Sequence, residues 1–339
     1  MKKLLCLVLV WFGLVSLAFS EVPPITDIFL SLPDTVVNIG SGSLSKQERQ
    51  RLLDAYNSEQ SYPDAETSID YITWEHSTIT MSNGFGRWTM SALPLKDSYL
   101  AIVIADRMSE DLQALEFYTY KKGKATKTEK FGYGDVKKRF NEYLKEWKNG
   151  TVDNVYMFFR ATRGRLEVCK EIQDYGVTTV PSVFAFSNSK QKFVEFDYYN
   201  INPIGMEYVE ILEKLYNGFV NAFNAKDYLL ALQYVSNDAI EAFEDFDFLV
   251  LYDETLPRFL FTVINNGMCI SGHEYSEYSD FSRIKSIKVG HTLYKDGPSP
   301  CIELSVDGKK IQVKLYLIEE TIGEGDVLGP VDLFTMPRG

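Results

Sequence analysis

The sequence predicts an α+β fold, built as two or three α+β domains with mainly antiparallel sheets. A length of 339 residues allows about two domains of ordinary size. Apolar residues at helical spacing come first in the chain, and segments that alternate with a period of two follow them. Helical spacing returns from residue 135 and again from residue 206, each time with strand-like segments after it. Helices and strands grouped in this way are typical of the α+β class.

Residues 1–20 are predicted to be a signal peptide. Lys2 and Lys3 give a short positive region, an apolar stretch follows, and the small residues Ala18 and Ser20 precede Glu21. The alternative is an uncleaved membrane anchor, which needs about 20 apolar residues. No later stretch is apolar over that length. We therefore expect a soluble protein that is exported to the periplasm or the extracellular space, with no membrane span after cleavage.

Two helices are expected at the start of the first domain, which we place at residues 21–203. The apolar residues of 22–39 are spaced as a short helix that ends before Pro33. Ser45 and Glu48 match a capping box, and an apolar stripe follows them. Residues 45–57 are therefore predicted to be helical.

The next part of the first domain is predicted to be a series of antiparallel strands. The apolar residues change to a period of two, and a turn is expected at residues 82–84. Strands are expected at residues 68–74, 77–81, 86–93, 99–105 and 115–120. Helical spacing over 135–147 then predicts a helix and marks a subdivision of this domain near residue 130.

This first part of the chain carries a resemblance. The stretches that carry it are Ile25-Thr-Asp-Ile-Phe-Leu-Ser-Leu-Pro-Asp34, Leu52-Leu-Asp-Ala-Tyr56, Leu93-Pro-Leu-Lys-Asp-Ser-Tyr99 and Phe117-Tyr-Thr-Tyr120. They resemble a family of exported bacterial proteins of unknown function, over about residues 22–125. The resemblance implies a location outside the cytoplasm and no particular activity.

Residues 135–215 carry a second resemblance. A strand is expected at 155–159, a helix at 165–174 and a strand at 183–186, with Tyr175-Gly-Val-Thr-Thr-Val-Pro-Ser182 before the last. This order resembles the second half of a thioredoxin fold. The resemblance implies a cis bond between Val180 and Pro181 and a peptide-binding edge beside them. The alternative is an ordinary strand, helix and strand with a loop proline.

The thioredoxin resemblance lacks the family's cysteines. The corresponding segment reads Phe131-Gly-Tyr-Gly-Asp135, and the chain has no Cys-x-x-Cys. The resemblance therefore implies a redox-inactive peptide-binding protein. Outside the leader the chain has Cys169, Cys269 and Cys301. A bridge between Cys269 and Cys301 and three reduced thiols both remain open.

The second domain is placed at residues 204–339. A long helix from Met206, the corner Asn224-Ala-Lys-Asp227 and a second helix at 228–235 are expected to precede strands at 283–292, 301–306 and 311–319. This order resembles the cone-shaped α+β domain that nuclear transport factor two and ketosteroid isomerase share. The resemblance implies an apolar pocket, which some members use for small-molecule chemistry and others for binding.

Candidate site residues are few. Besides Val180 and Pro181, the C-terminal domain offers His273, Glu274 and His291, which could bind a ligand or act as acid and base. Their spacing matches no metal-ligand motif, and no Gly-x-Ser-x-Gly, P-loop or dinucleotide pattern occurs. We therefore expect no catalytic residue, no metal and no cofactor. Whether the protein is an enzyme stays open, and a protein without enzyme activity is favoured.

Composition and charge narrow the function further. Hydrophobic residues make up 45% and charged residues 24%, which excludes collagen-like and wholly disordered chains. The chain has 35 Lys and Arg against 47 Asp and Glu, so we expect no nucleic-acid partner. The first hypothesis is a non-catalytic binding or assembly module whose partner is a protein, a peptide or a small ligand. The alternatives are a small-ligand carrier or enzyme that uses the C-terminal pocket, and the redox-inactive thioredoxin-like protein.

Overall fold

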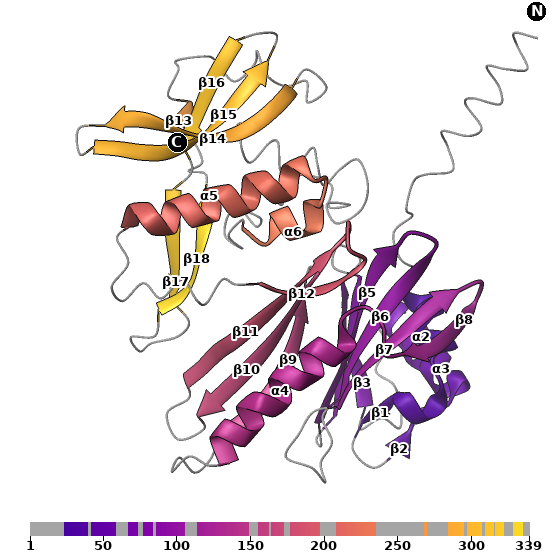
Figure 1. Cartoon of the computed structure of the whole chain (residues 1–339). Coiled ribbons are helices and arrows are strands. Elements are labelled where there is room, and N and C mark those ends of the chain that lie inside the picture. Colours follow the sequence, from indigo (N-terminus) through magenta and orange to yellow (C-terminus); the bar gives the residue numbers. More distant parts are fainter. Residues whose placement is uncertain are drawn as a thin grey trace, which may run out of the picture.

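A computed structural model gives the fold of the chain (Figure 1). It describes residues 24–39, 42–58, 67–73, 77–83, 86–105, 114–148, 155–162, 164–172, 177–196, 208–234, 268–269, 284–294, 297–306, 309–314, 316–321 and 328–334. Every strand pair in these ranges is antiparallel, and helices accompany the sheets, so the fold is α+β as predicted. The predicted signal peptide lies outside the described residues. Within them, no helix is both long and apolar enough to cross a membrane.

The first unit is a six-stranded meander with two helices against one of its faces. The helices are α2 (Ile25–Ser31) and α3 (Lys46–Asn57), with the short elements η1 (Asp34–Val36), β1 (Asn38–Ile39) and β2 (Gly42–Ser43) between them. The strands run in sheet order as β3 (Thr67–Thr73), β4 (Thr78–Asn83), β5 (Gly86–Leu95), β6 (Ser98–Ala105), β7 (Ala114–Lys121) and β8 (Lys124–Thr128). The predicted strands and the two predicted helices of this region are confirmed.

The capping box of α3 forms as predicted. The Glu48 backbone N–H donates to Ser45 Oγ at 3.3 Å, and the Ser45 backbone N–H donates to Glu48 Oε2 at 2.7 Å. The two bonds satisfy donors that the first turn of a helix otherwise leaves unpaired.

Strand β6 is buried on both faces. Leu100, Ile102 and Ile104 belong to one hydrophobic cluster, and Ala101, Val103 and Ala105 belong to the other. Because neighbouring residues of a strand point to opposite faces, the meander lies between two layers. The α2 and α3 helices form one layer, and the next part of the chain forms the other.

That other layer contains α4 (Tyr133–Lys148) and a four-stranded sheet. The sheet comprises β9 (Val155–Thr162), β10 (Arg165–Ile172), β11 (Val177–Ser187) and β12 (Lys192–Phe196), in the order β12-β11-β10-β9. The predicted helix over 135–147 is confirmed by α4, which stacks Phe140 on Phe159 of β9 at a ring distance of 4.3 Å.

The predicted helix at 165–174 is wrong, because residues 165–172 form β10. Leu166 and Val168 alternate with polar residues and are buried, which is a strand pattern, and β10 pairs with both β9 and β11. Gly164 turns the chain into β10 with φ +77°, a conformation that glycine adopts without strain. The strand–helix–strand order on which the thioredoxin resemblance rests is therefore absent.

The last part of the chain consists of two helices and two small sheets. The helices are α5 (Tyr208–Asn224) and α6 (Tyr228–Leu232). One sheet has the order β13 (Met268–Cys269), β16 (Lys309–Lys314), β15 (Gly297–Val306) and β14 (Ile284–Tyr294), and the other pairs β17 (Tyr316–Thr321) with β18 (Leu328–Phe334). The predicted helices and the predicted strands at 283–292 and 301–306 are confirmed with shifted ends. The single strand predicted at 311–319 is wrong, because this stretch forms two strands, β16 and β17, that belong to different sheets.

The core does not end where the second domain is predicted to begin. The helix α5 contacts β14 and β15, and α6 contacts β11. The larger hydrophobic cluster therefore includes residues of the meander, of the four-stranded sheet and of α5 and α6 together. The division of the chain near residue 203 stays a prediction.

Candidate functional site

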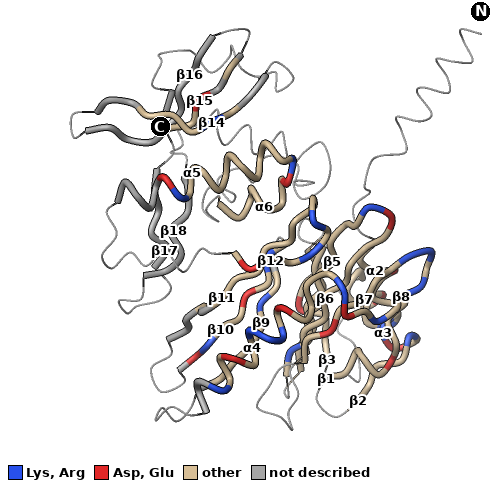
Figure 2. Tube along the Cα trace, viewed as in Figure 1, with Lys and Arg blue, Asp and Glu red and all other residues tan. Residues whose placement is uncertain are grey.

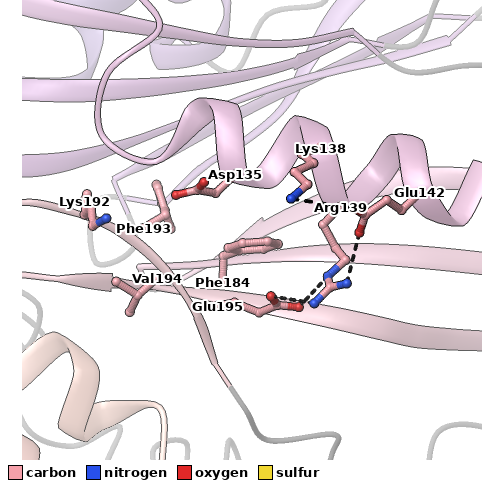
Figure 3. Close-up of a pocket in the computed structure, with 9 residues that line it drawn as sticks. All are labelled: Asp135, Lys138, Arg139, Glu142, Phe184, Lys192, Phe193, Val194 and Glu195. Carbon is pink, nitrogen blue, oxygen red and sulfur yellow. Dashed lines mark hydrogen bonds and ion pairs between the residues drawn. The ribbon is translucent and has the colours of Figure 1, made fainter.

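A groove of about 300 Å³ lies between α4 and the hairpin of β11 and β12 (Figure 3). From α4 it receives Asp135, Lys138, Arg139 and Glu142, which share one side of the helix because they are three or four residues apart. From the hairpin it receives Phe184, Lys192, Phe193, Val194 and Glu195.

The amphipathic pattern of α4 places these charges. Val136, Phe140 and Leu144 recur every four residues and are buried in the larger core cluster. The neighbouring positions, occupied by the charged residues, are left at the flank of the helix beside β12. The sequence of α4 therefore fixes both its packing and the charged wall of the groove.

Gly132 brings the start of α4 directly against β12. It has φ +87°, and a Cβ at this position would lie 2.5 Å from the Phe193 carbonyl oxygen. The Phe193 backbone N–H donates to the Phe131 carbonyl at 2.9 Å, so backbone meets backbone at this point. Any side chain at residue 132 would push the two walls of the groove apart.

One end of the groove holds an ion-pair network. Arg139 Nε and Nη2 donate to the two carboxylate oxygens of Glu195 at 2.7 and 2.8 Å, and Nη1 donates to Glu142 Oε2 at 3.0 Å. Ser182 Oγ of β11 donates to Glu195 Oε1 at 3.0 Å. The bond to Glu195, with smaller contributions from nearby charges such as that of Glu142, raises the pKa of Arg139 above its usual value. The network ties α4 to the hairpin across the groove.

The other end of the groove carries two charges without partners. Figure 3 shows Asp135 and Lys192 at this end, away from the Arg139 network. Both side chains are exposed, and within the described ranges neither has a hydrogen-bond or ion-pair partner. Phe184 and Phe193 also line the groove, but both side chains are buried, with 1% and 0% of their surface exposed. The groove thus offers a ligand chiefly one anion and one cation that are unpaired among the described residues.

The β12 wall also offers backbone groups. Strand β12 is at the edge of its sheet, and its Phe193 N–H points away from β11 toward Phe131. In an antiparallel pair, the residues that bond to the partner strand alternate with residues that do not. The N–H and C=O of Glu195, two residues on, therefore also point away from β11.

The predicted site residues Val180 and Pro181 do not line this groove. The pairing of β10 with β11 passes from Val168↔Ser182 to Lys170↔Thr179, so both residues lie in a bulge opposite Cys169. The bulge accommodates a proline, which cannot donate a hydrogen bond to a neighbouring strand. Val180 is 5% exposed, and among the described residues, β11 included, no peptide bond is cis. The implied cis bond is therefore wrong.

Of the predicted C-terminal site, the structure describes only His291. It lies exposed on β14, and its Nε2 is 2.9 Å from Glu213 Oε1 of α5. His273 and Glu274 lie outside the described residues, and in the described part no group of three His, Cys, Asp or Glu side chains could hold a metal. A pocket built on these three residues stays a prediction.

Two cysteines, Cys169 and Cys301, are reduced. Cys169 and Cys301 are both buried, and neither forms a disulfide. The proposed bridge between Cys269 and Cys301 is therefore wrong.

No family model, no curated protein and no solved structure matches this sequence. The resemblances to exported bacterial proteins and to the cone-shaped fold stay predictions.

Sequence reasoning missed the groove, although part of its signal was present. The charged positions beside the apolar stripe of α4 could have been read as one wall. The opposite wall could not have been found in this way, because Arg139 and Glu195 are far apart in the chain and meet only through the fold.

Proposed function

We propose that this protein is an exported, non-catalytic binding module whose groove between α4 and β12 takes an extended segment of a partner polypeptide. The observation that carries the proposal is the pair of exposed charges at one end of the groove, Asp135 and Lys192, whose side chains have no partner in the described part of the chain. Export is supported by the leader pattern of residues 1–20.

An extended segment fits the shape and chemistry of this site. The groove lies open between a helix and an edge strand, whose Glu195 backbone groups point away from the sheet. Extended peptides bind edge strands through such groups and place alternate side chains to either side. A lysine and a glutamate at neighbouring positions would then face Asp135 on one wall and Lys192 on the other.

The carboxylates of the groove support binding rather than acid–base catalysis. Glu142 and Glu195 are about 40% exposed, and both are paired with Arg139. General acid–base chemistry favours a carboxylate whose pKa burial has moved toward neutrality. A solvated carboxylate that is paired with an arginine is better suited to holding the two walls of the groove in place.

The test uses a fluorescein-labelled peptide, Val-Phe-Val-Lys-Glu, and measures its fluorescence anisotropy with the protein. We expect Lys192→Glu to raise the Kd about tenfold, because an attraction becomes a repulsion. The double variant Asp135→Lys with Lys192→Glu exchanges the two charges of the groove and should restore binding. The peptide lysine can then face the glutamate at position 192, and the peptide glutamate can face the lysine at position 135.

The matched control is Lys46→Glu, which reverses an exposed lysine on α3 and should leave the Kd unchanged. Two outcomes would contradict the proposal. One is that the wild-type protein does not bind the peptide, and the other is that Lys46→Glu weakens binding as much as Lys192→Glu does.

A further inference from the structure

Positive charge is concentrated in one segment of this acidic chain. Residues 121–139 contain eight Lys and Arg against two Asp and Glu, whereas the whole chain has 35 against 47. In Figure 2 the tube is blue at the turn between β7 and β8, and the basic residues from position 137 onward lie on α4. Four of the eight, Lys121, Lys122, Lys124 and Lys127, lie on the β7–β8 hairpin, which is therefore basic in a chain that is acidic as a whole.

The lysines at the hairpin tip are uncompensated. Lys121, Lys122 and Lys124 are exposed, and in the described part of the chain none has a hydrogen-bond or ion-pair partner. Lys127, further along β8, differs because its Nζ lies 2.7 Å from Glu116 Oε1. The three tip charges are thus available to a partner.

The residues at the tip are not those that would make the hairpin most stable. Lys122 and Gly123 form a two-residue turn with φ of 52° and 77°, and lysine is strained in this left-handed region, where asparagine is preferred. Lys121 lies directly opposite Lys124, so like charges face each other across the strands. Residues that lower local stability in this way are expected at functional sites, where the function requires a side chain that the local structure does not favour.

We propose that the β7–β8 tip docks on the surface of a bilayer that contains anionic phospholipids. Lysine ammonium groups on a projecting turn can reach several headgroup phosphates at once, which suits a flat anionic surface better than one small ligand. Tyr99 and Tyr120, next to the tip, are half-buried with ring centres 6.4 Å apart, and tyrosine suits the headgroup region.

The charge of the remaining chain sets the orientation of docking. Anionic lipids repel the acidic parts of the molecule and attract the basic hairpin, so the tip should meet the surface first. The three tip lysines are not among the residues that line the groove, so their use does not depend on a peptide ligand.

The test measures co-sedimentation of residues 21–339 with vesicles. Both hydrophobic clusters of the described residues begin at Ile25 or later, so omitting the predicted leader removes none of these core residues, and it takes away an apolar segment that could itself bind vesicles. Vesicles of phosphatidylcholine and phosphatidylglycerol in equal parts are compared with pure phosphatidylcholine. We expect binding to the anionic vesicles alone, and weaker binding as the salt concentration rises.

Two substitutions separate docking from hairpin stability. Lys122→Asn relieves the turn and Lys124→Glu replaces a like-charge pair by an opposite-charge pair, so both should raise the melting temperature slightly. Each should nevertheless lower the vesicle partition coefficient, about fivefold for each lysine lost. The control Lys46→Asn removes an exposed lysine from α3 and should leave the partition coefficient unchanged.

The proposal fails if either tip variant binds the anionic vesicles as tightly as the wild type. It also fails if inorganic phosphate displaces the protein more than chloride of equal ionic strength, because the tip would then be a site for a free ion. The protein could also bind polyglutamate as tightly as vesicles, with both tip variants abolishing that binding. This result would overturn the lipid proposal and indicate an acidic protein as the partner.

Discussion

At the scale of single residues, burial decides which side chains of this protein can react. Cys169 on β10 has no exposed surface and lies opposite the bulge at Val180 and Pro181. Desolvation, with a smaller effect from the charge of Glu167, raises the pKa of the thiol well above its usual range. Since the thiolate is the nucleophile, this cysteine is expected to be inert in the folded protein.

The first prediction at this scale concerns alkylation of Cys169. Native protein treated with iodoacetamide at mildly alkaline pH should carry no label on the peptide that contains Cys169. Protein unfolded in urea should be labelled there completely, because unfolding exposes the thiol and returns its pKa to the ordinary value. Peptide mass spectrometry measures both. Stoichiometric labelling of the native protein would show that the β10–β11 bulge opens readily.

At the scale of elements, one buried arginine joins the two N-terminal helices. Arg49 of α3 is 1% exposed, and its guanidinium donates to the carbonyls of Leu44 and Leu32 at 2.7 and 2.8 Å. It also lies 3.1 Å from Asp34. Burial lowers its pKa, and the carboxylate of Asp34 opposes that shift. One side chain thus satisfies carbonyls at the end of α2 and before α3.

The element-scale prediction is that Arg49→Lys lowers the free energy of unfolding by about 2 kcal/mol, because one ammonium cannot replace the spread donors of the guanidinium. Urea unfolding measures the change. The control Arg51→Lys alters an exposed arginine of the same helix and should shift the free energy by less than about 0.5 kcal/mol. Full stability of Arg49→Lys would mean that charge alone is sufficient at this position.

The same scale shows how far the sequence could predict the structure. Local patterns were sufficient for α3, whose cap is formed by Ser45 and Glu48, and for the meander, in which β4 and part of β5 alternate apolar and polar residues while β6 is a short apolar run. Residues 165–172 were ambiguous, because Val168 and Ile172 are also four residues apart, as on a helix face. Pairing with β9 and β11 decided the outcome, and such pairing is a tertiary effect.

The candidate site was harder to predict than the fold. Its two walls come from α4 and β12, which no short-range pattern relates, and its defining bond joins Arg139 to Glu195. The predicted residues Val180 and Pro181 were placed by a resemblance whose required helix is absent. A neighbouring residue, Ser182, does contact the site through Glu195.

At the scale of the whole molecule, polar bonds join the C-terminal helices to the four-stranded sheet. Arg165 of β10 donates from Nε to Gln233 Oε1 at 2.9 Å and from Nη2 to the Gln233 carbonyl at 3.1 Å, just after α6. Asp227, between α5 and α6, is 2% exposed. It accepts hydrogen bonds from the Ser187 hydroxyl and from the Asn188 backbone N–H of the β11–β12 turn.

These bonds lie beside a shared hydrophobic cluster, so we expect β11 and α5 to open together. Asp227→Ala leaves the donors of the β11–β12 turn without their acceptor and should lower the free energy of unfolding by about 3 kcal/mol. Hydrogen exchange with mass spectrometry measures the coupling. In the wild type, peptides from β11 and α5 should share one opening free energy, and in the variant α5 should exchange first because its link to the sheet is lost.

The control for this last prediction is Asp97→Ala, which removes an exposed carboxylate from the β5–β6 turn and should change neither exchange rate. Residues on both sides of position 203 belong to one cluster, so cooperative opening follows if that cluster is the main source of stability. If α5 exchanges much faster than β11 already in the wild type, the cluster does not couple them. The C-terminal part would then be an independent domain, as the sequence predicts.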